Sequence, residues 1–182
     1  MGGNKKKAGR RNARHTYDDI GRYGAMPHAV YQHENFLRLT SHGRMLLLDV
    51  IMQFNGSNNG DLCITFAVSQ GFGWKSRETL DVARAELLHY GLIICTKRGG
   101  LGIPSLYAVT WRRINECSGK HDAQPTNTPS GLWRQPTEKW DRARWIASRK
   151  SKKKIKPQHG SRASMTCKST VAVSRDASQY HS

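Results

Sequence analysis

The sequence has little of what a membrane, secreted or zinc protein needs. No apolar run exceeds four residues, the length of the run from Met45 to Leu48, so we expect no transmembrane helix. The lysine-rich N-terminus has no apolar stretch behind it, which argues against a secretory signal. The four cysteines form no CxxC pair, and no His/Cys cluster has zinc spacing. We therefore predict a cytoplasmic protein with reduced thiols and without a metal or a cofactor.

Acidic residues are also scarce, and the excess of basic ones is unevenly placed. The 182 residues include 30 Lys and Arg against 13 Asp and Glu, a formal net charge of +17. Residues 1–25 carry +5, residues 26–117 only +2, and residues 118–182 carry +10. Basic flanks on a nearly neutral domain indicate a polyanionic partner, most commonly nucleic acid. No apolar anchor or lipidation motif supports a membrane partner.

Catalytic motifs are missing as well. The glycines from Gly99 to Gly102 are not followed by the Gly-Lys-Ser/Thr of a phosphate-binding loop, and the segment from Gly71 to Ser76 lacks the required glycine spacing and preceding strand. The eight histidines lie mostly in polar segments, and no nucleophile, base and orienting acid can be assembled from the sequence. We therefore expect a binding protein and not an enzyme.

Composition divides the chain into five parts. The ends are poor in large aliphatic residues and rich in Lys, Arg, Ser and Gly, a composition typical of disorder. We predict a disordered basic arm over 1–25, a globular domain over 26–117, a linker over 118–136, a helix over 137–150, and a disordered basic tail over 151–182.

Hydrophobic periodicity predicts the helices of the central domain. A helix over 40–54, capped by Thr40 or Ser41, would place five apolar residues on one face: Leu46, Leu47, Val50, Ile51 and Phe54. After an asparagine- and glycine-rich turn, we expect a short strand within 61–66 and a helix near 65–70. Ser76 is a good N-cap for a helix over 77–90, and Gly91 stands where a helix commonly ends.

Two β-rich segments follow and complete the domain. Residues 92–96 and 106–111 predict an antiparallel hairpin, and the glycine-rich segment 97–105 forms its tip. The segments that identify the overall pattern are Phe54–Leu62, Gly73–Ser76, Thr79–Leu80, Glu86–Leu87, Gly91–Ile93 and Leu106–Trp111. With this order of elements, residues 27–114 resemble winged helix-turn-helix DNA-binding proteins of bacterial phages and mobile elements. The resemblance implies an α+β winged-helix fold, with a three-helix helix-turn-helix core and a β-hairpin wing, and DNA binding in the bacterial nucleoid.

The resemblance also implies where DNA would bind. In winged helices, the second helix of the helix-turn-helix enters the major groove and the wing contacts phosphates or the minor groove. The exposed face of the helix over 77–90 would carry Glu78, Asp81, Val82, Ala85 and His89, which is not a basic surface. The candidate contacts therefore lie at the helix start, on the helix flank and at the wing root: Lys75, Ser76, Arg77, Thr79, Arg84, Lys97 and Arg98. Arg84 has an equal alternative as a surface partner of Asp81 or Glu86.

A second apolar stripe on the helix over 40–54 needs a cover. It consists of Met45, Leu48 and Met52. We expect the segment with Trp133, Trp140 and Trp145 to fold back over it, but a second subunit or residues 30–39 could do so instead. Stacking of these three tryptophans on nucleic acid is the alternative to docking, whereas Trp74 and Trp111 should pack inside the domain.

The sequence favours duplex DNA binding by a transcriptional regulator of a mobile element. Two alternatives stay open: a plasmid or phage replication-initiation protein that binds an origin, and a nucleic-acid-binding protein whose basic tails bind RNA or DNA without sequence preference. A homodimer would match palindromic DNA sites.

Overall fold

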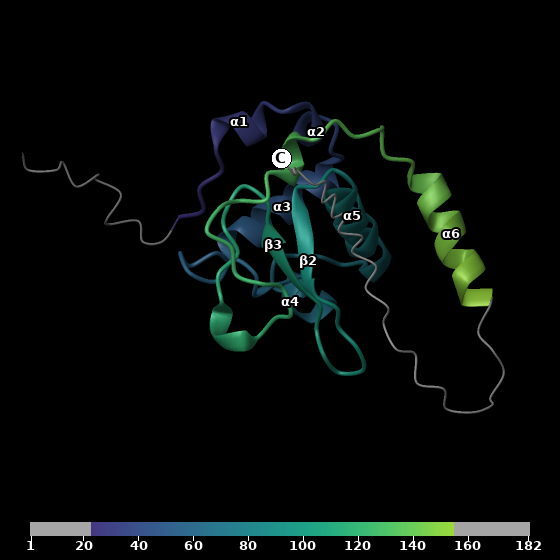
Figure 1. Ribbon diagram of the computed structural model, residues 1–182. Helices are drawn as coiled ribbons and strands as arrows, with labels where there is room; N and C mark the ends of the chain where they lie inside the picture. The colour runs from purple at the N-terminus through teal and green to yellow at the C-terminus, as the bar shows by residue number, and fades with distance from the viewer. Residues whose placement is uncertain (1–22, 155–182) are drawn as a thin grey trace, which may run out of the picture. The chain divides into compact units, whose positions relative to one another are not determined.

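The computed structural model describes residues 23–154, with helical backbone only for the last three of them. Residues 1–22 of the arm predicted over 1–25, and residues 155–182 of the tail predicted over 151–182, lie outside the described residues. Two units are distinguished, residues 1–142 and residues 143–182. The first unit holds an α+β fold, and the second holds most of helix α6 (Figure 1).

Helices on one side of a small sheet make up the first unit. The short helices α1 (His28–Tyr31) and α2 (Glu34–Leu37) precede α3 (Ser41–Met52), and α4 (Phe66–Gln70) precedes α5 (Arg77–His89). Strands β1 (Leu62–Cys63), β2 (Ile93–Lys97) and β3 (Leu106–Val109) form an antiparallel sheet in the order β1-β3-β2. Figure 1 shows α5 alongside the β2–β3 hairpin, with the connecting loop near α4.

Local signals in the sequence place the two long helices correctly. The Thr40 hydroxyl accepts a hydrogen bond from the backbone N–H of Gly43, and the Ser76 hydroxyl accepts one from that of Thr79. Gly91 follows α5 with a φ of +63°, a conformation that glycine adopts without steric cost. Both predicted N-caps and the predicted helix end are therefore confirmed.

The core also follows the predicted helix faces, with two exceptions. The inward residues of both helices are buried: Leu46, Leu47, Val50, Ile51, Leu80, Ala83 and Leu87. Val82, expected on the exposed face of α5, is buried. Phe54, expected in the core, is only half-buried because α3 ends at Met52 and the chain turns outward. Strand β3 ends at Val109, and all four of its residues are buried, not alternate ones as in a strand with one exposed face.

The segment expected to be a linker, residues 118–136, packs on the domain instead. The side chain of Trp133 is only 5% exposed and belongs to the core, and that of His121 is buried. Backbone hydrogen bonds join Gly131 N–H to Thr110 O and Thr126 N–H to Ile114 O. The polar composition of this segment predicted a spacer, but one tryptophan and these backbone bonds tie it to the β3 end of the domain.

Trp133 and Trp140 pack elsewhere than on the stripe for which the sequence predicted them. Trp133 packs in the core and Trp140 lies partly buried against it; the backbone N–H of Trp140 donates to the Tyr90 hydroxyl over 2.9 Å. The stripe residues Met45, Leu48 and Met52 keep 40%, 54% and 56% of their surface exposed. Nor do residues 30–39 cover them, since Val30, Phe36 and Leu39 point into the core.

The last helix begins later than predicted. Helix α6 runs from Arg142 to Lys154, whereas the sequence predicted a helix over 137–150. The Thr137 hydroxyl instead donates to Gln135 O, so it contributes to the end of the packed segment. Residues 151–154, expected in the disordered tail, continue the helix.

Candidate nucleic-acid interface

The predicted contacts at the start of α5 divide into structural and exposed residues. Ser76 and Thr79 supply the cap hydrogen bond, 3.3 Å from hydroxyl to N–H, and so fix where the helix begins. Lys75 and Arg77 flank that cap and are exposed. A helix N-terminus presents unpaired N–H groups and favours anions, so two exposed cations beside it make a suitable phosphate contact.

A cleft of about 200 Å³ lies between the start of α5 and the loop that connects β2 to β3. Arg77 and Arg84 line its helix side, and Ile103, Pro104 and Ser105 line its loop side. The Arg77 guanidinium lies over the ring of Phe66, 5.2 Å from the ring centroid, which holds its long side chain at the cleft. The structure thus brings two predicted site residues together with the predicted wing.

Arg84 is held in place by groups on both sides. Its guanidinium donates to the Asp81 carboxylate over 2.6 Å, which selects the surface-pair alternative for this residue. It also faces the buried Tyr107 hydroxyl. Burial raises the pKa of Tyr107, and interactions with Arg84 and Ser105 oppose that rise. Arg84 therefore joins α5 to β3 and contributes one wall of the cleft, with its charge already shared with Asp81.

Glu86, the other partner considered for Arg84, has a different role. Its side chain is 1% exposed and accepts hydrogen bonds from the Thr40 N–H and hydroxyl, at 2.9 and 2.7 Å. The carboxylate thereby fastens the N-terminus of α3 to the middle of α5. A Cβ atom on Gly43 would lie 2.6 Å from a Glu86 carboxylate oxygen, so a larger residue there would displace the carboxylate that bonds Thr40.

The wing-root pair does not join the cleft. The Lys97 ammonium donates to Lys120 O over 2.9 Å, and the Lys120 ammonium donates to the Asp61 carboxylate over 2.7 Å. The hydrogen bond to Asp61 raises the pKa of Lys120. Lys97 therefore reaches toward the segment after β3, while Arg98 is exposed at the loop root. Neither residue lines the cleft with Arg77.

The β2–β3 loop has two features that the sequence analysis does not predict. Leu101 is fully exposed and Ile103 is largely exposed, so the loop presents apolar side chains beyond its basic root. The Gly100–Ile103 bridge closes this tip into a tight turn. The sequence signal was available, because Leu101 and Ile103 alternate with Gly100, Gly102 and Pro104, but the glycines were interpreted only as loop formers.

The family models, curated proteins and solved structures with which the chain was compared gave no match. Among residues 23–154, no helix is long and apolar enough to cross a membrane. The same residues contain no group of three or more His, Cys, Asp or Glu side chains placed to hold a metal ion.

Proposed function

We propose that the protein binds duplex DNA through a winged-helix domain and regulates transcription of a mobile element. The observation that carries this proposal is the cleft in which the exposed start of α5 faces the β2–β3 loop. The element order α3, β1, α4, α5, β2, β3 and the sheet order β1-β3-β2 support it, because they place one capped helix and one hairpin loop on the same side.

In the proposed complex, α5 enters the major groove by its N-terminus. Lys75 and Arg77 contact phosphates or base edges there, and the helix N–H groups add to the attraction of phosphate. The tip of the loop, with Leu101 and Ile103, contacts the adjacent minor groove, where apolar side chains can insert between base steps. Arg84 positions the helix against β3 and makes no base contact.

Most of the affinity is expected to come from outside the central domain. Residues 1–25 and 118–182 together hold +15 of the +17 charges, so their cations should dominate the release of counterions from DNA. On this basis, binding weakens steeply with salt, whereas sequence preference depends on the α5 start.

Selection of bound fragments from a random duplex library by the full-length protein tests the proposal. We expect one enriched sequence, and the Lys75→Ala/Arg77→Ala variant should lose about 1 to 3 kcal/mol per base contact at that sequence. The matched control is Arg134→Ala/Lys139→Ala, which removes the same charge from exposed positions of the 133–140 segment. Equal weakening by both double variants, or no enrichment, would leave only tail-driven binding without sequence preference.

The library result also separates regulation from replication. Enrichment of a single site near the protein's own promoter supports a regulator. Enrichment of closely spaced repeats from an origin supports a replication-initiation protein instead, which would use the same interface.

A further inference from the structure

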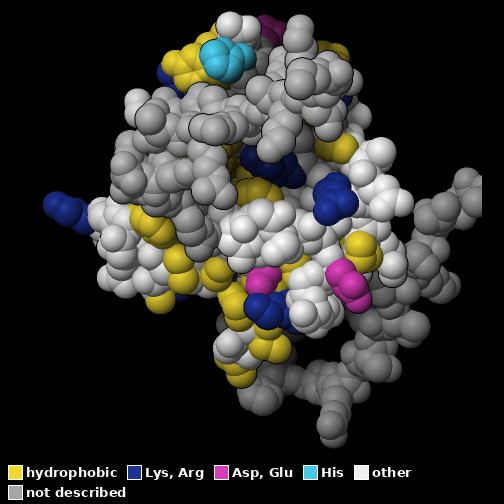
Figure 2. All heavy atoms as spheres, turned by 90° about the vertical axis from the view of Figure 1, so that its left-hand side faces the viewer, with side chains coloured by type: hydrophobic (Ala, Val, Ile, Leu, Met, Phe, Trp, Pro, Cys, Tyr) yellow, Lys and Arg dark blue, Asp and Glu magenta, His cyan; other side chains and the backbone are white. Residues whose placement is uncertain are grey.

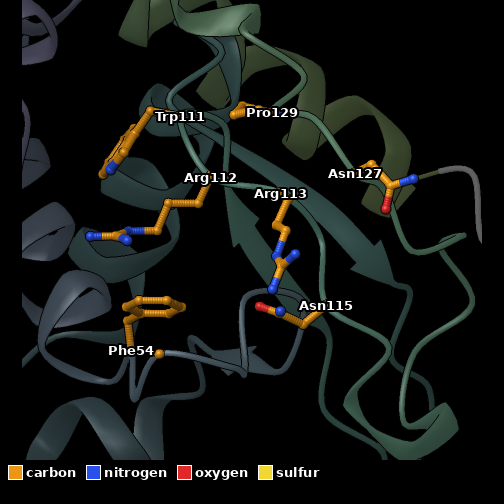
Figure 3. Close-up of a pocket in the computed structure, with 8 residues that line it drawn as sticks. Phe54, Trp111, Arg112, Arg113, Asn115, Asn127 and Pro129 are labelled. Atoms are coloured by element: carbon orange, nitrogen blue, oxygen red, sulfur yellow. The ribbon is translucent and has the colours of Figure 1, made fainter.

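A second cleft lies at the end of β3 farthest from the β2–β3 loop. Strand β3 starts next to that loop at Leu106 and ends at Val109. Trp111, two residues beyond the end of β3, lines the cleft. It has a volume of about 310 Å³. Six residues give it its chemical character: Phe54, Trp111, Arg112, Arg113, Asn115 and Asn127. We call it the arginine–aromatic cleft (Figure 3).

Hydrogen-bond donors dominate the lining. Arg112 and Arg113 contribute two guanidinium groups, and none of the Asp and Glu residues within 23–154 lines the cleft. In Figure 3 the Arg113 and Asn115 side chains point toward one another at its lower side. The Asn115 carbonyl oxygen already accepts from the backbone N–H of Asn59 over 3.1 Å, which leaves its amide NH₂ as a donor. Asn127 adds a second exposed amide. Such a set of donors suits an anion.

Flat aromatic and guanidinium surfaces form the other side. The Arg112 guanidinium lies 4.4 Å from the centroid of the Phe54 ring, and in Figure 3 its side chain lies between that ring and the Trp111 indole. The Trp111 indole nitrogen is buried and has no hydrogen-bond partner among the described residues. Buried polar atoms are normally paired, so Trp111 leaves a donor for which the described residues supply no acceptor.

The lining of the cleft limits the kind of ligand that fits it. Where Figure 2 colours side chains by type, Lys and Arg side chains lie beside hydrophobic ones, so mixed surfaces of this kind are present on the face it draws. A ligand with only a negative charge would use the arginines and leave the flat surfaces unused. A ligand that combines a phosphate with a planar base would use both, since bases stack on aromatic and guanidinium planes.

We propose that the arginine–aromatic cleft binds a nucleotide, with its phosphate on Arg113 and Asn115 and its base against the Trp111 and Arg112 side. The volume lies at the lower end of the range for small-molecule sites, so it suits one nucleotide and not a duplex. The nucleotide can be free or can belong to a single strand. The site goes beyond the proposed duplex binding and does not depend on the α5 start.

The indole N–H signals of the full-length protein, labelled with ¹⁵N-tryptophan, provide the assay at about 0.2 M salt, where exposed charges are screened. The five tryptophans give five signals, and Trp111→Phe identifies the one from the cleft. We expect 5′-AMP to shift that signal, and Arg113→Ala to weaken the binding of 5′-AMP about ten- to hundredfold. Arg113 is exposed, so its removal leaves the core intact.

The matched control is Arg134→Ala. Arg134 is also exposed and also stacks on a tryptophan, 4.7 Å from the ring centroid of Trp133, but it lies outside the cleft. We expect it to keep the affinity for 5′-AMP within twofold. Adenosine carries the base without a phosphate, and succinate carries negative charge without a base. Each should bind at least tenfold more weakly than 5′-AMP.

Three results would each overturn the proposal: a Trp111 signal that neither 5′-AMP nor a 5′-phosphorylated oligothymidylate moves, equal weakening by Arg113→Ala and Arg134→Ala, or succinate binding as tightly as 5′-AMP. Tighter binding of the oligothymidylate than of 5′-AMP assigns the site to single strands, and the reverse assigns it to free nucleotides. Duplex binding by Lys75→Ala/Arg77→Ala is measured separately, so failure of this site and failure of the proposed function are distinguishable.

Discussion

Replacement of Asn59 is expected to cause a large loss of stability, because this polar side chain is both buried and hydrogen-bonded. This side chain is fully buried in the turn before β1. Its carbonyl oxygen accepts from the Val109 N–H over 2.8 Å, and its amide group donates to the carbonyl oxygens of Val109, Arg112 and Arg113 over 3.1, 3.3 and 2.9 Å. Asn59 thereby fixes the end of β3 and the start of the arginine–aromatic cleft.

The magnitude follows from one accepted hydrogen bond and from two N–H groups shared among three carbonyl oxygens, together equivalent to about three hydrogen bonds. At about 1 kcal/mol net for each, Asn59→Ala should lower the free energy of unfolding by about 3 kcal/mol. Urea unfolding followed by tryptophan fluorescence measures it. The matched control is Asn58→Ala, because the Asn58 side chain bonds only within the same turn, to Asn55 N–H and Gln53 O. We expect about 1 to 2 kcal/mol there.

The variant Asn59→Asp tests the reasoning by its pH dependence. It preserves shape and the acceptor for Val109 N–H, but it turns a carboxylate toward three carbonyl oxygens. Burial and these carbonyls would raise the pKa of the new carboxyl in the folded state, so its penalty is absent below about pH 4 and grows as pH rises through the raised value. A loss under about 1 kcal/mol for Asn59→Ala, or a loss for Asn59→Asp that does not change with pH, would refute this account.

Three further predictions concern other parts of the first unit. Trp133→Ala should cost about 3 to 5 kcal/mol, the range for truncating a core aromatic, whereas a true linker residue would cost almost nothing in the same urea experiment. Burial raises the pKa of Asp49, although the hydrogen bond from Trp74 opposes this rise. The protonated Asp49 side chain therefore favours the folded state, and this stabilisation is lost as pH rises above about 4. Asp49→Asn, which cannot ionise, should make the free energy of unfolding at pH 4 and at pH 7 more nearly equal. Leu48 is exposed, so Leu48→Glu should change the free energy of unfolding of a monomer by less than about 0.5 kcal/mol. If a second subunit covers the exposed stripe, the same variant should abolish the self-association that sedimentation measures.

The elements that could be predicted are those specified by neighbouring residues. Thr40 and Ser76 cap helices through N–H groups three positions away, and Gly91 ends α5 by its own backbone freedom. The apolar faces of α3 and α5 recur at helical spacing, so they too are visible in a short stretch of sequence. The α+β class and the order of elements follow from these local signals.

The contacts that could not be predicted join residues far apart. Asn35 is buried and donates to Trp133 O and Gln135 O, about a hundred positions away, and nothing in its neighbourhood marks it as a core residue. The polar composition around Trp133 predicted a linker for the same reason. Trp133 was assigned to docking, but on the stripe of α3, because hydrophobic periodicity shows that a face is apolar and does not show which segment covers it.

In the candidate interface, the position of Lys75 and Arg77 beside the start of α5 could be predicted from the sequence. The directions in which the Arg84 and Lys97 side chains extend could not. The alternative partner for Arg84 was present in the sequence as Asp81, three positions earlier on the same helix. Lys97 was assigned to the wing because of its position, and its bond to Lys120 O depends on the path of the chain after β3. The apolar residues of the arginine–aromatic cleft were missed because Phe54 and Trp111 fit the pattern of core residues.

The long reach from Asn35 to the segment around Trp133 has a consequence for how the protein is made. Ribosomes add about 5 to 20 residues each second, so the 22 residues from Trp111 to Trp133 take roughly one to four seconds to synthesise after the sheet is complete. During that interval the Asn35 amide can bond the carbonyl of Tyr90, but the segment around Trp133, whose carbonyl is its other acceptor, is not yet present. The surface around Asn35 therefore stays exposed in the nascent domain until the segment around Trp133 has been synthesised. Slow translation of residues 111–135 should make the nascent domain a target for chaperones and proteases.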